Sequence, residues 1–380
     1  MKIRQIRAVG LTGATPAGGW RDELRPDDAV HTLITVHTDE GLTGIGSVFT
    51  NDKLVRAALD ILEPLYLGES ALEPERLSEK LHQHTFWLGR GGSLTHTISG
   101  IDIALWDLLG QATGQPVGRL LGGRYRHRVR PYASVLMDQP DVLTERLDAL
   151  LDKGFRAFKV GWGPFGRHSS TVDERIVSAA RDAIGADRLL MVDAGGSEAF
   201  WPHGYTWALR TADMLQAYGV HWFEEPLRPD AIEDYAALRR ATRVAIAAGE
   251  VLTRRQTYLP WLQGHAVDII QPDVTKVGGL SEQRRIGWMA HDNGIRLIPH
   301  GWNTAVGLAA DLQLASALPD TDLVEYIAGS AYVDDITADG WKLDSDGMLS
   351  IPDRPGLGIQ IDPERLARYA DAESLLALSS

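Results

Sequence analysis

The feature that most constrains the fold is an alternation of short β-prone runs with amphipathic helical runs between about Arg128 and Tyr326. This alternation is typical of repeated βα units, and it predicts eight strands. The predicted strands are residues 129–134, 157–161, 189–193, 220–224, 244–250, 267–273, 296–300 and 323–326. Eight parallel strands at this spacing indicate an α/β fold of the TIM type, a (β/α)7β barrel whose chemistry lies at the carboxyl ends of the strands.

The first third of the chain has a different pattern, in which strands precede helices. A hairpin is predicted around Asp39-Glu40-Gly41, and a long helix is predicted to end at Gly114. The strand patterns cover residues 31–36 and 42–48, and the helical patterns cover roughly 54–65, 73–83 and 95–113. We therefore predict an α+β domain over residues 1–125, the barrel over 126–337, and a tail over 338–380 that returns to the first domain.

Composition excludes several classes of function. Lys and Arg total 38 against 51 for Asp and Glu, and the net charge of −13 argues against a nucleic-acid-binding or membrane-binding surface. The chain has no cysteine, which excludes disulfides, thiolate metal sites and a cysteine nucleophile. Residues 1–7 alternate like a strand and lack the apolar run of a signal peptide, and no run is apolar enough for a membrane span. We expect a soluble cytoplasmic protein.

Ionisable residues end six consecutive predicted strands. They are Asp193, Glu224, Glu250, Asp273, His300 and Glu325, at intervals of 31, 26, 23, 27 and 25 residues. Each interval is about one βα unit, so the six side chains reach the same rim of the barrel. Any one of them alone could be a solvated loop residue or a helix N-cap, but six in register predict a shared site.

Asp193, Glu224 and Glu250 are the predicted Mg²⁺ ligands. Carboxylates on three adjacent strands provide the hard oxygen ligands that octahedral Mg²⁺ prefers and leave positions for water and substrate. Without a cation, three converging carboxylates would repel one another. Glu225 competes with Glu224 for this role, but neighbours in a strand face opposite sides, and we choose Glu224.

His300 and Asp273 form a predicted proton-transfer pair on neighbouring strands. The carboxylate orients the imidazole and stabilises its charged form, which makes the histidine a better base. Glu325, if protonated, could donate a hydrogen bond to a developing oxyanion. The competing interpretation of His300 is a core histidine, but its position before Gly301, at a strand-to-loop junction, favours catalysis.

Motifs along nearly the whole chain resemble the enolase superfamily, and specifically its mandelate racemase subgroup. They are Thr38-Asp39-Glu40-Gly41-Leu42-Thr43-Gly44, Ser99-Gly100-Ile101-Asp102-Ile103-Ala104-Leu105-Trp106-Asp107, Val192-Asp193-Ala194, Phe223-Glu224-Glu225-Pro226, Ala248-Gly249-Glu250, Gln271-Pro272-Asp273-Val274-Thr275-Lys276-Val277-Gly278-Gly279, Pro299-His300 and Val324-Glu325-Tyr326. The resemblance implies that the first domain caps the barrel mouth. It also implies that bound Mg²⁺ holds the substrate carboxylate while a base removes the proton on the α-carbon.

Two positions depart from the pattern of this subgroup. Its members commonly end the second barrel strand with Lys-x-Lys, whose second lysine is a base opposite the histidine. Here Lys159 is retained, and Gly161 is expected to leave a gap where the second ammonium group would lie. Many relatives also have Asn or His two residues after the first metal ligand, where this chain has Gly195.

The missing second lysine disfavours a racemase, which needs an acid and a base on opposite faces of the intermediate. Dehydration needs one base and one acid, and His300 serves as both if elimination is syn. We predict a hydro-lyase that converts an aldonate or aldarate into a 2-keto-3-deoxy acid, with Lys159 among the catalytic residues. The alternatives are a cycloisomerase of a sugar-acid lactone, a racemase or epimerase, and a non-catalytic binding protein.

The predicted partner is therefore a small carboxylate, a sugar acid, and we also expect the protein to form a homo-oligomer. Trp20 and Arg21 lie in a Gly-rich segment, residues 11–26, that is predicted to close over the barrel mouth and contact the substrate. The alternative is a surface loop without such contacts. Trp162 and His203, which follow the second and third barrel strands, are two further substrate-binding candidates.

Overall fold

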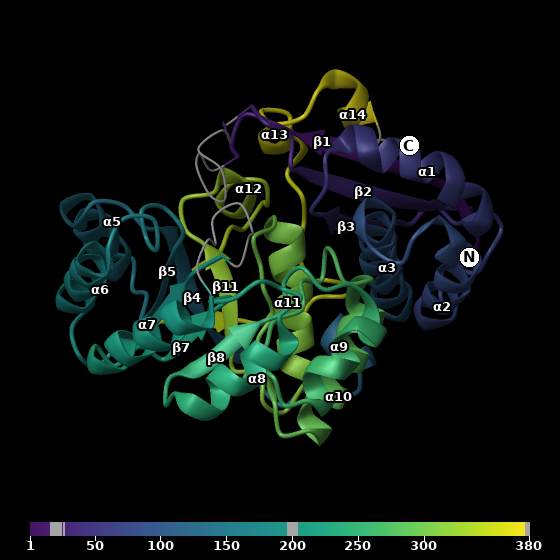
Figure 1. The fold of residues 1–380 in the computed structure, drawn as a ribbon. Helices are drawn as coiled ribbons and strands as arrows, with labels where there is room; N and C mark the ends of the chain where they lie inside the picture. The colour runs from purple at the N-terminus through teal and green to yellow at the C-terminus, as the bar shows by residue number, and fades with distance from the viewer. Residues whose placement is uncertain (16–24, 26, 196–203, 377–380) are drawn as a thin grey trace.

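The computed structural model describes residues 1–15, 25, 27–195 and 204–376 (Figure 1). Within these residues, eight parallel strands alternate with seven helices, and the strands pair in the order β10-β9-β8-β7-β6-β5-β4-β11. The elements are β4 (Arg128–Leu136), α5 (Pro140–Asp152), β5 (Ala157–Gly161), α6 (Ser170–Ile184), β6 (Leu189–Asp193), α7 (Tyr205–Ala217), β7 (Trp222–Glu224), α8 (Ile232–Ala241), β8 (Ala245–Ala248), α9 (Arg254–Gln263), β9 (Ile269–Ile270), α10 (Gly279–Asp292), β10 (Arg296–Leu297), α11 (Ala305–Ala317) and β11 (Leu323–Ile327). The predicted (β/α)7β arrangement is confirmed.

One apolar side chain from each barrel strand, or from the residue after it, fills the barrel interior. This buried cluster contains Tyr132, Ala157, Met191, Trp222, Ala247, Ile269, Ile298 and Leu323. Side chains two residues apart on a strand point to the same side. The residues two positions further along β5, β6, β7 and β11 therefore also point inward, above this apolar layer. Those four residues are Lys159, Asp193, Glu224 and Glu325.

The N-terminal part is an antiparallel sheet covered by helices, drawn in purple and blue against the barrel in Figure 1. It contains β1 (Ile3–Leu11), β2 (His31–Thr38), β3 (Thr43–Val48), α1 (Asp52–Tyr66), α2 (Pro74–Thr85), the 3-10 helix η1 (Phe86–Leu88), α3 (Gly92–Thr113) and α4 (Val117–Leu120). The predicted hairpin pairs β2 with β3. Gly114 ends α3 in the left-handed conformation, φ 65°, as predicted. Close packing of α3 on β3 requires Gly46, because a Cβ there would lie 1.8 Å from the Gly100 carbonyl oxygen.

A buried polar seam joins α3 of this cap to α10 of the barrel. The Asp102 carboxylate accepts a hydrogen bond from the backbone N–H of Ser281 at 2.9 Å, and the Ser99 hydroxyl accepts one from that of Gly278 at 2.8 Å. The Trp106 indole donates to the Ser281 hydroxyl at 3.0 Å. Because every partner is buried, the seam holds the cap in a defined position on the barrel.

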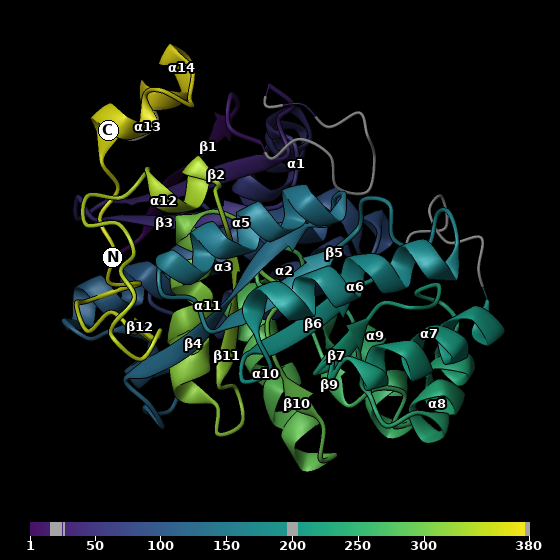
Figure 2. The same cartoon turned by 90° about the vertical axis from the view of Figure 1, so that its left-hand side faces the viewer.

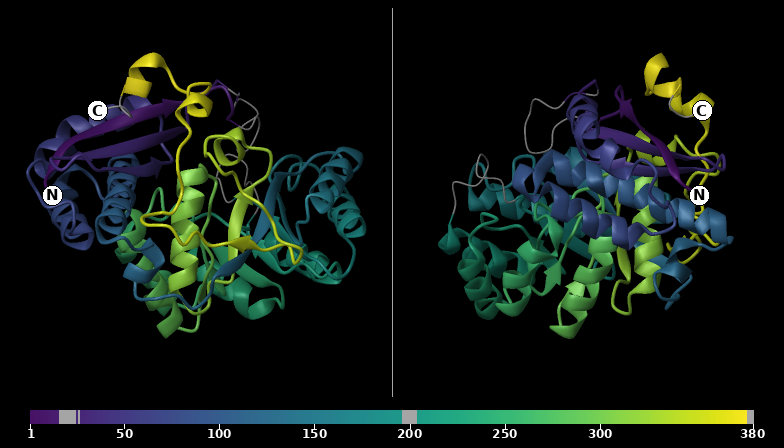
Figure 3. Two further views of the ribbon diagram at one scale, coloured as in Figure 1. Left: turned by 180° about the vertical axis from the view of Figure 1, so that it is seen from behind. Right: turned by 90° about the vertical axis from the view of Figure 1, so that its right-hand side faces the viewer.

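The tail contacts both parts of the molecule (Figure 3). It contains α12 (Ala331–Asp334), β12 (Leu349–Ser350), α13 (Pro363–Leu366) and α14 (Ala372–Leu376). β12 pairs with the barrel strand β4, whereas Gly356 exchanges backbone hydrogen bonds with the cap and the Tyr369 carbonyl accepts one from the Thr12 N–H. Because the tail contacts both the cap and the barrel, the predicted domain boundaries at residues 125 and 337 remain a proposal. In the part of the chain that the structure describes, no helix has the length and apolar character needed to cross a membrane.

Candidate active site

Lys159 lies at the centre of the inward-facing polar layer. Its Nζ is 2.6 Å from Oε1 of Glu224, 2.9 Å from Oε1 of Glu325 and 3.2 Å from Oδ2 of Asp193. Burial disfavours the charged amine, but attraction to the three carboxylates is stronger, and the pKa of Lys159 is raised well above its usual value. Lys159 therefore holds its proton and acts as a fixed cation.

Glu224 is held on both carboxylate oxygens. Besides the contact with Lys159, its Oε2 accepts hydrogen bonds from the Trp222 indole and the Gln271 amide, each at 2.9 Å. Its side chain points into the barrel, as predicted for the inward-facing member of the pair.

Glu225 does not follow the expected alternation. β7 ends at Glu224, and Glu225 adopts a left-handed backbone conformation, φ 44°, so the strand rule no longer sets its direction. Its side chain is buried, and its pKa is raised by burial and then by repulsion from Glu250, Asp193 and Glu224. Strand alternation therefore does not describe Glu225, and its raised pKa favours the neutral carboxyl group.

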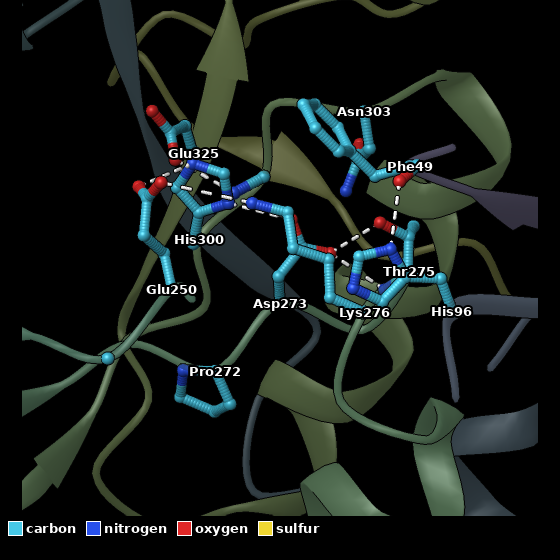
Figure 4. Close-up of polar contacts among 12 residues, drawn as sticks. Phe49, His96, Glu250, Pro272, Asp273, Thr275, Lys276, His300, Asn303 and Glu325 are labelled. Atoms are coloured by element: carbon cyan, nitrogen blue, oxygen red, sulfur yellow. Dashed lines mark hydrogen bonds and ion pairs between the residues drawn. The ribbon is translucent and has the colours of Figure 1, made fainter. Parts of the chain in front are cut away.

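His300 bridges two carboxylates (Figure 4). Its Nδ1 is 2.7 Å from Oδ2 of Asp273, and its Nε2 is 2.9 Å from Oε2 of Glu250. Asp273 is itself oriented by the backbone N–H and the hydroxyl of Thr275. Burial lowers the pKa of His300, but the carboxylates of Glu250, Glu325 and Asp273 together outweigh it, and the pKa is raised well above its usual value. The predicted pairing of His300 with Asp273 is present, and the contact with Glu250 was not predicted.

Glu325 was predicted to act as a hydrogen-bond donor only if it is protonated, and its surroundings favour the ionised form. Its Oε2 accepts a hydrogen bond from the Gly301 N–H at 2.7 Å, while its Oε1 faces Lys159. Burial raises its pKa, but Lys159 and His300 outweigh burial and the pKa is lowered. Glu325 is therefore a carboxylate, because it is surrounded by cations and donors.

A small cavity of about 30 Å³ opens among these groups. It is lined by Phe49, Lys159, Trp162, Asp193, Glu250, Lys276, His300 and Trp302. The volume suits roughly one water molecule or one metal ion. Trp162, a predicted substrate-binding residue, is brought to the site, and its left-handed backbone, φ 59°, marks a strained position of the kind common at functional sites.

Sequence reasoning assigned no role to Lys276, which the structure places at the site (Figure 4). Its Nζ lies 3.7 Å from Oδ2 of Asp273 and 3.8 Å from Oε1 of Glu250. The ammonium group also lies 4.3 Å from the centre of the Phe49 ring, a cation–π contact supplied by the cap. Its position three residues after the strand-end Asp273 was the one available signal.

The structure explains both departures from the subgroup pattern. Gly161 leaves no gap, because a Cβ at this position would lie 2.7 Å from the Cβ of Asp193. Gly195 has φ 84°, and a Cβ there would lie 2.6 Å from the Trp162 ring. Gly161 makes room for the predicted metal ligand Asp193, and Gly195 makes room for the Trp162 indole. Trp20, Arg21 and His203 lie outside the described residues, as does most of the segment 11–26.

The chemistry of the donors fits a divalent cation. Six carboxyl groups gather at the barrel mouth, those of Asp193, Glu224, Glu225, Glu250, Asp273 and Glu325, and the cationic groups described there are Lys159, Lys276 and His300. The pKa of Asp193 is raised to about 8 by burial and by Glu224, the response of a carboxylate that lacks sufficient positive charge. Among the described residues, no three acids or histidines already converge as metal ligands, since Lys159 and His300 contact them instead.

Comparison with known proteins gives a consistent result. Residues 142–365 match the family "Enolase C-terminal domain-like", and residues 26–122 match "Mandelate racemase / muconate lactonizing enzyme, N-terminal domain". The chain is 33% identical to D-galactarolactone cycloisomerase of Agrobacterium fabrum over 97% of its length and 99% of that protein. It is 32% identical to arabinonate dehydratase of Saccharolobus solfataricus over 86% of its length and 87% of that protein.

Solved structures give the same relationship. The 3,6-anhydro-D-galactonate cycloisomerase of Zobellia galactanivorans has a TM-score of 0.87 and 29% identity, covering 98% of this chain and all of that one. A racemase of Streptomyces coelicolor with bound magnesium has a TM-score of 0.83 and 29% identity, covering 97% of this chain and all of that one. The matched domains span most of the chain and include every strand-end acid described above. The chain belongs to the enolase superfamily, in its mandelate racemase subgroup, and is an enzyme.

Proposed function

We propose that this enzyme is a Mg²⁺-dependent acid-sugar dehydratase, which converts an aldonate or aldarate into a 2-keto-3-deoxy acid. The observation that supports the proposal most directly is the position of His300. Asp273 fixes one ring nitrogen, and the imidazole lines the cavity beside the predicted metal ligands Asp193 and Glu250. This arrangement presents one imidazole to the α-carbon of a carboxylate bound there.

When bound by Asp193, Glu224 and Glu250, Mg²⁺ would stabilise the negative charge that develops on the substrate carboxylate. Residues of the chain attract the substrate and transfer the protons. Lys159 and Lys276 place two fixed cations beside the cavity, and both attract the carboxylate of the incoming acid.

Nε2 of His300 then takes the α-proton, while the Asp273 carboxylate holds Nδ1–H and stabilises the imidazolium. The electron pair of the broken C–H bond forms the enediolate. The electron pair of the enediolate then forms a double bond between the α- and β-carbons. At the same time the bond between the β-carbon and its hydroxyl breaks, and His300 gives its proton to the departing oxygen. One water and one enol result, and the enol becomes the 2-keto-3-deoxy acid. Both proton transfers take place on the same face, which makes the elimination syn.

In the structure His300 Nε2 contacts Glu250, and this contact raises its pKa. Proton abstraction needs the neutral imidazole, so Glu250 must turn away from His300 before His300 acts as a base. Glu250 would meet this requirement if it bound Mg²⁺ in place of His300.

The second candidate is a cycloisomerase, in which a ring oxygen rather than water leaves from the β-carbon. The 33% identity with D-galactarolactone cycloisomerase over nearly the full length of both proteins favours it. Both reactions share the proton transfer from the α-carbon to His300, and they differ only in the group that departs.

A substrate panel tests the proposal. The enzyme with Mg²⁺ is incubated separately with open-chain aldonates and aldarates and with lactones and anhydro acids, and the products are identified by NMR. A dehydratase releases a 2-keto-3-deoxy acid from an open-chain acid. Turnover of ring compounds alone would replace the dehydratase assignment with the cycloisomerase, and no turnover of either class would contradict both assignments.

A further inference from the structure

A second, larger hollow of about 500 Å³ lies at the end of the barrel opposite the candidate active site. β4, β5 and β6 begin there, and the tail segment that leads into β12 contributes Ser345, Asp346 and Met348 to the lining. β12 pairs with β4 at this end of the strand (Figure 2). It is lined by Arg128, Arg130, Arg156, Asp187, Arg188, Ser345, Asp346 and Met348. Four arginines on one wall are unexpected in a chain of net charge −13.

The fold places these arginines side by side. Arg128 and Arg130 are two residues apart on β4 and therefore share one side of the strand. Arg156 and Arg188 immediately precede β5 and β6, and the Leu189 N–H donates to the Arg156 carbonyl at 3.3 Å. The amino ends of three adjacent strands thus present guanidinium groups to the same hollow.

Three of the four arginines are outside any ion pair among the described residues, although Asp187 and Asp346 also line the hollow and offset part of the charge. Arg128 pairs with Asp344 at 3.0 Å and Asp346 at 2.7 Å. Within the described ranges, Arg130, Arg156 and Arg188 form no ion pair, and Asp187 forms none although it also lines the hollow. The Nε atoms of Arg130 and Arg188 are buried and have no hydrogen-bond partner, while Nη1 of Arg188 donates to the Ile184 carbonyl at 2.7 Å.

We propose that this pocket, defined by Arg130, Arg156 and Arg188, binds a small molecule with two or more phosphate or carboxylate groups. Guanidinium groups form paired hydrogen bonds with the oxygens of either anion, and three of them side by side suit more than one anionic group. The volume lies within the range of small-molecule sites and exceeds what a single inorganic ion needs.

The pocket is separate from the catalytic groups. Arg188 and Asp193 lie at opposite ends of β6, and five residues of strand separate their backbones by roughly 15 Å. A ligand in the pocket therefore does not occupy the catalytic cavity. This proposal is independent of which reaction the enzyme performs.

Isothermal titration calorimetry on the full chain with Mg²⁺ tests the proposal. The probes are fructose 1,6-bisphosphate and tricarballylate, which distinguish phosphate from carboxylate ligands, with chloride at equal ionic strength as the reference. The tested variant is Arg130→Gln/Arg156→Gln, because neither side chain makes a hydrogen bond or ion pair in the described structure. The matched control is Arg175→Gln, an exposed arginine on α6.

We expect at least one probe to bind, and the double variant to weaken binding at least about tenfold, since charge-assisted hydrogen bonds are lost. Arg175→Gln should leave the affinity unchanged. Binding that the double variant does not weaken would place the anion elsewhere and overturn the proposal. It would also be overturned if neither probe binds at millimolar concentration, or if sedimentation shows that these arginines instead hold two copies of the chain together.

Discussion

At the scale of single residues, the carboxylates at the barrel mouth have unequal partners. Glu224 has a partner on each oxygen, whereas Glu225 has a strained backbone and is repelled by three neighbouring acids. The family resemblance and the inward direction of the side chain both favour Glu224 as the metal ligand. Burial and this repulsion raise the pKa of Glu225, which favours its neutral form in the metal-free site.

Glu224→Gln should weaken Mg²⁺ binding at least about 100-fold, because even residues that only support metal ligands typically contribute about 10–100-fold. Glu225→Gln should have a smaller effect, since Glu225 is not a predicted ligand and its raised pKa favours the neutral form. Calorimetric titration with Mg²⁺ measures both, with the exposed Glu145→Gln on α5 as the control. A larger loss in Glu225→Gln than in Glu224→Gln would reverse the assignment.

Position 161 gives a second prediction at this scale. Gly161→Ala introduces a Cβ only 2.7 Å from that of Asp193, so the carboxylate must move. We expect the unfolding free energy to fall by about 1–3 kcal/mol, as for other overpacked cores, together with a loss of Mg²⁺ affinity. Urea denaturation and Mg²⁺ titration measure these changes. In the control, Gly204→Ala, the new Cβ meets no atom of the described residues within 4 Å. If Gly161→Ala behaved like this control, the close packing against Asp193 would be disproved.

At the scale of elements, the seam between α3 and α10 contains a buried acid. Burial raises the pKa of Asp102 from its usual 3.8 to about 8, against the opposing effect of the hydrogen bonds from Ser281. The folded protein therefore holds this proton more tightly than the unfolded chain does. The resulting stabilisation is complete below pH 3.8 and is lost as the pH rises through about 8.

Asp102→Asn, which resembles the protonated acid, should remove this dependence. Between pH 5 and 8 the wild-type unfolding free energy should fall relative to that of the variant, by at most about 1.4 kcal/mol per pH unit. Denaturation curves of both proteins across this range provide the measurement. Parallel stability profiles would show that Asp102 is ionised throughout.

The elements were predictable from the sequence because their signals are local. Short apolar runs predicted all eight barrel strands, and Gly114 predicted where α3 ends. β9 and β10 are only two residues long, whereas the patterns predicted seven and five. Beyond Ile270 the chain leaves the regular hydrogen-bonded strand pairing and turns, so that Asp273 and Lys276 face the site. An apolar sequence pattern does not show at which residue the hydrogen bonds between strands stop.

At the scale of the whole molecule, contacts between distant segments escaped sequence reasoning. Phe49 of the cap reaches Lys276 of the barrel, and a carboxylate predicted only as a metal ligand, Glu250, contacts His300. The close approach of Asp193 to Gly161 likewise depends on the pairing of β5 with β6. Such contacts arise from the register of strands far apart in the chain, which spacing alone does not specify.

The excess of acids also predicts how the whole molecule responds to metal. Mg²⁺ at 100 times its dissociation constant should stabilise the folded state by about 2.7 kcal/mol and raise the melting temperature by a few degrees. Glu224→Gln should abolish this shift, and Na⁺ at equal ionic strength should not reproduce it. A melting temperature that does not respond to Mg²⁺ would contradict the metal site.

The central claim is that His300, oriented by Asp273, is the base that removes the α-proton. The direct measurement follows deuterium incorporation by NMR, with a sugar acid that the wild type turns over in deuterium oxide. The wild type should give product labelled with one stereochemistry. His300→Asn should lose exchange and turnover by at least the roughly 10²–10⁴-fold that acid–base catalysis contributes, while Lys159→Met retains slow exchange. Continued exchange in His300→Asn together with its loss in Lys159→Met would make Lys159 the base and contradict the syn mechanism.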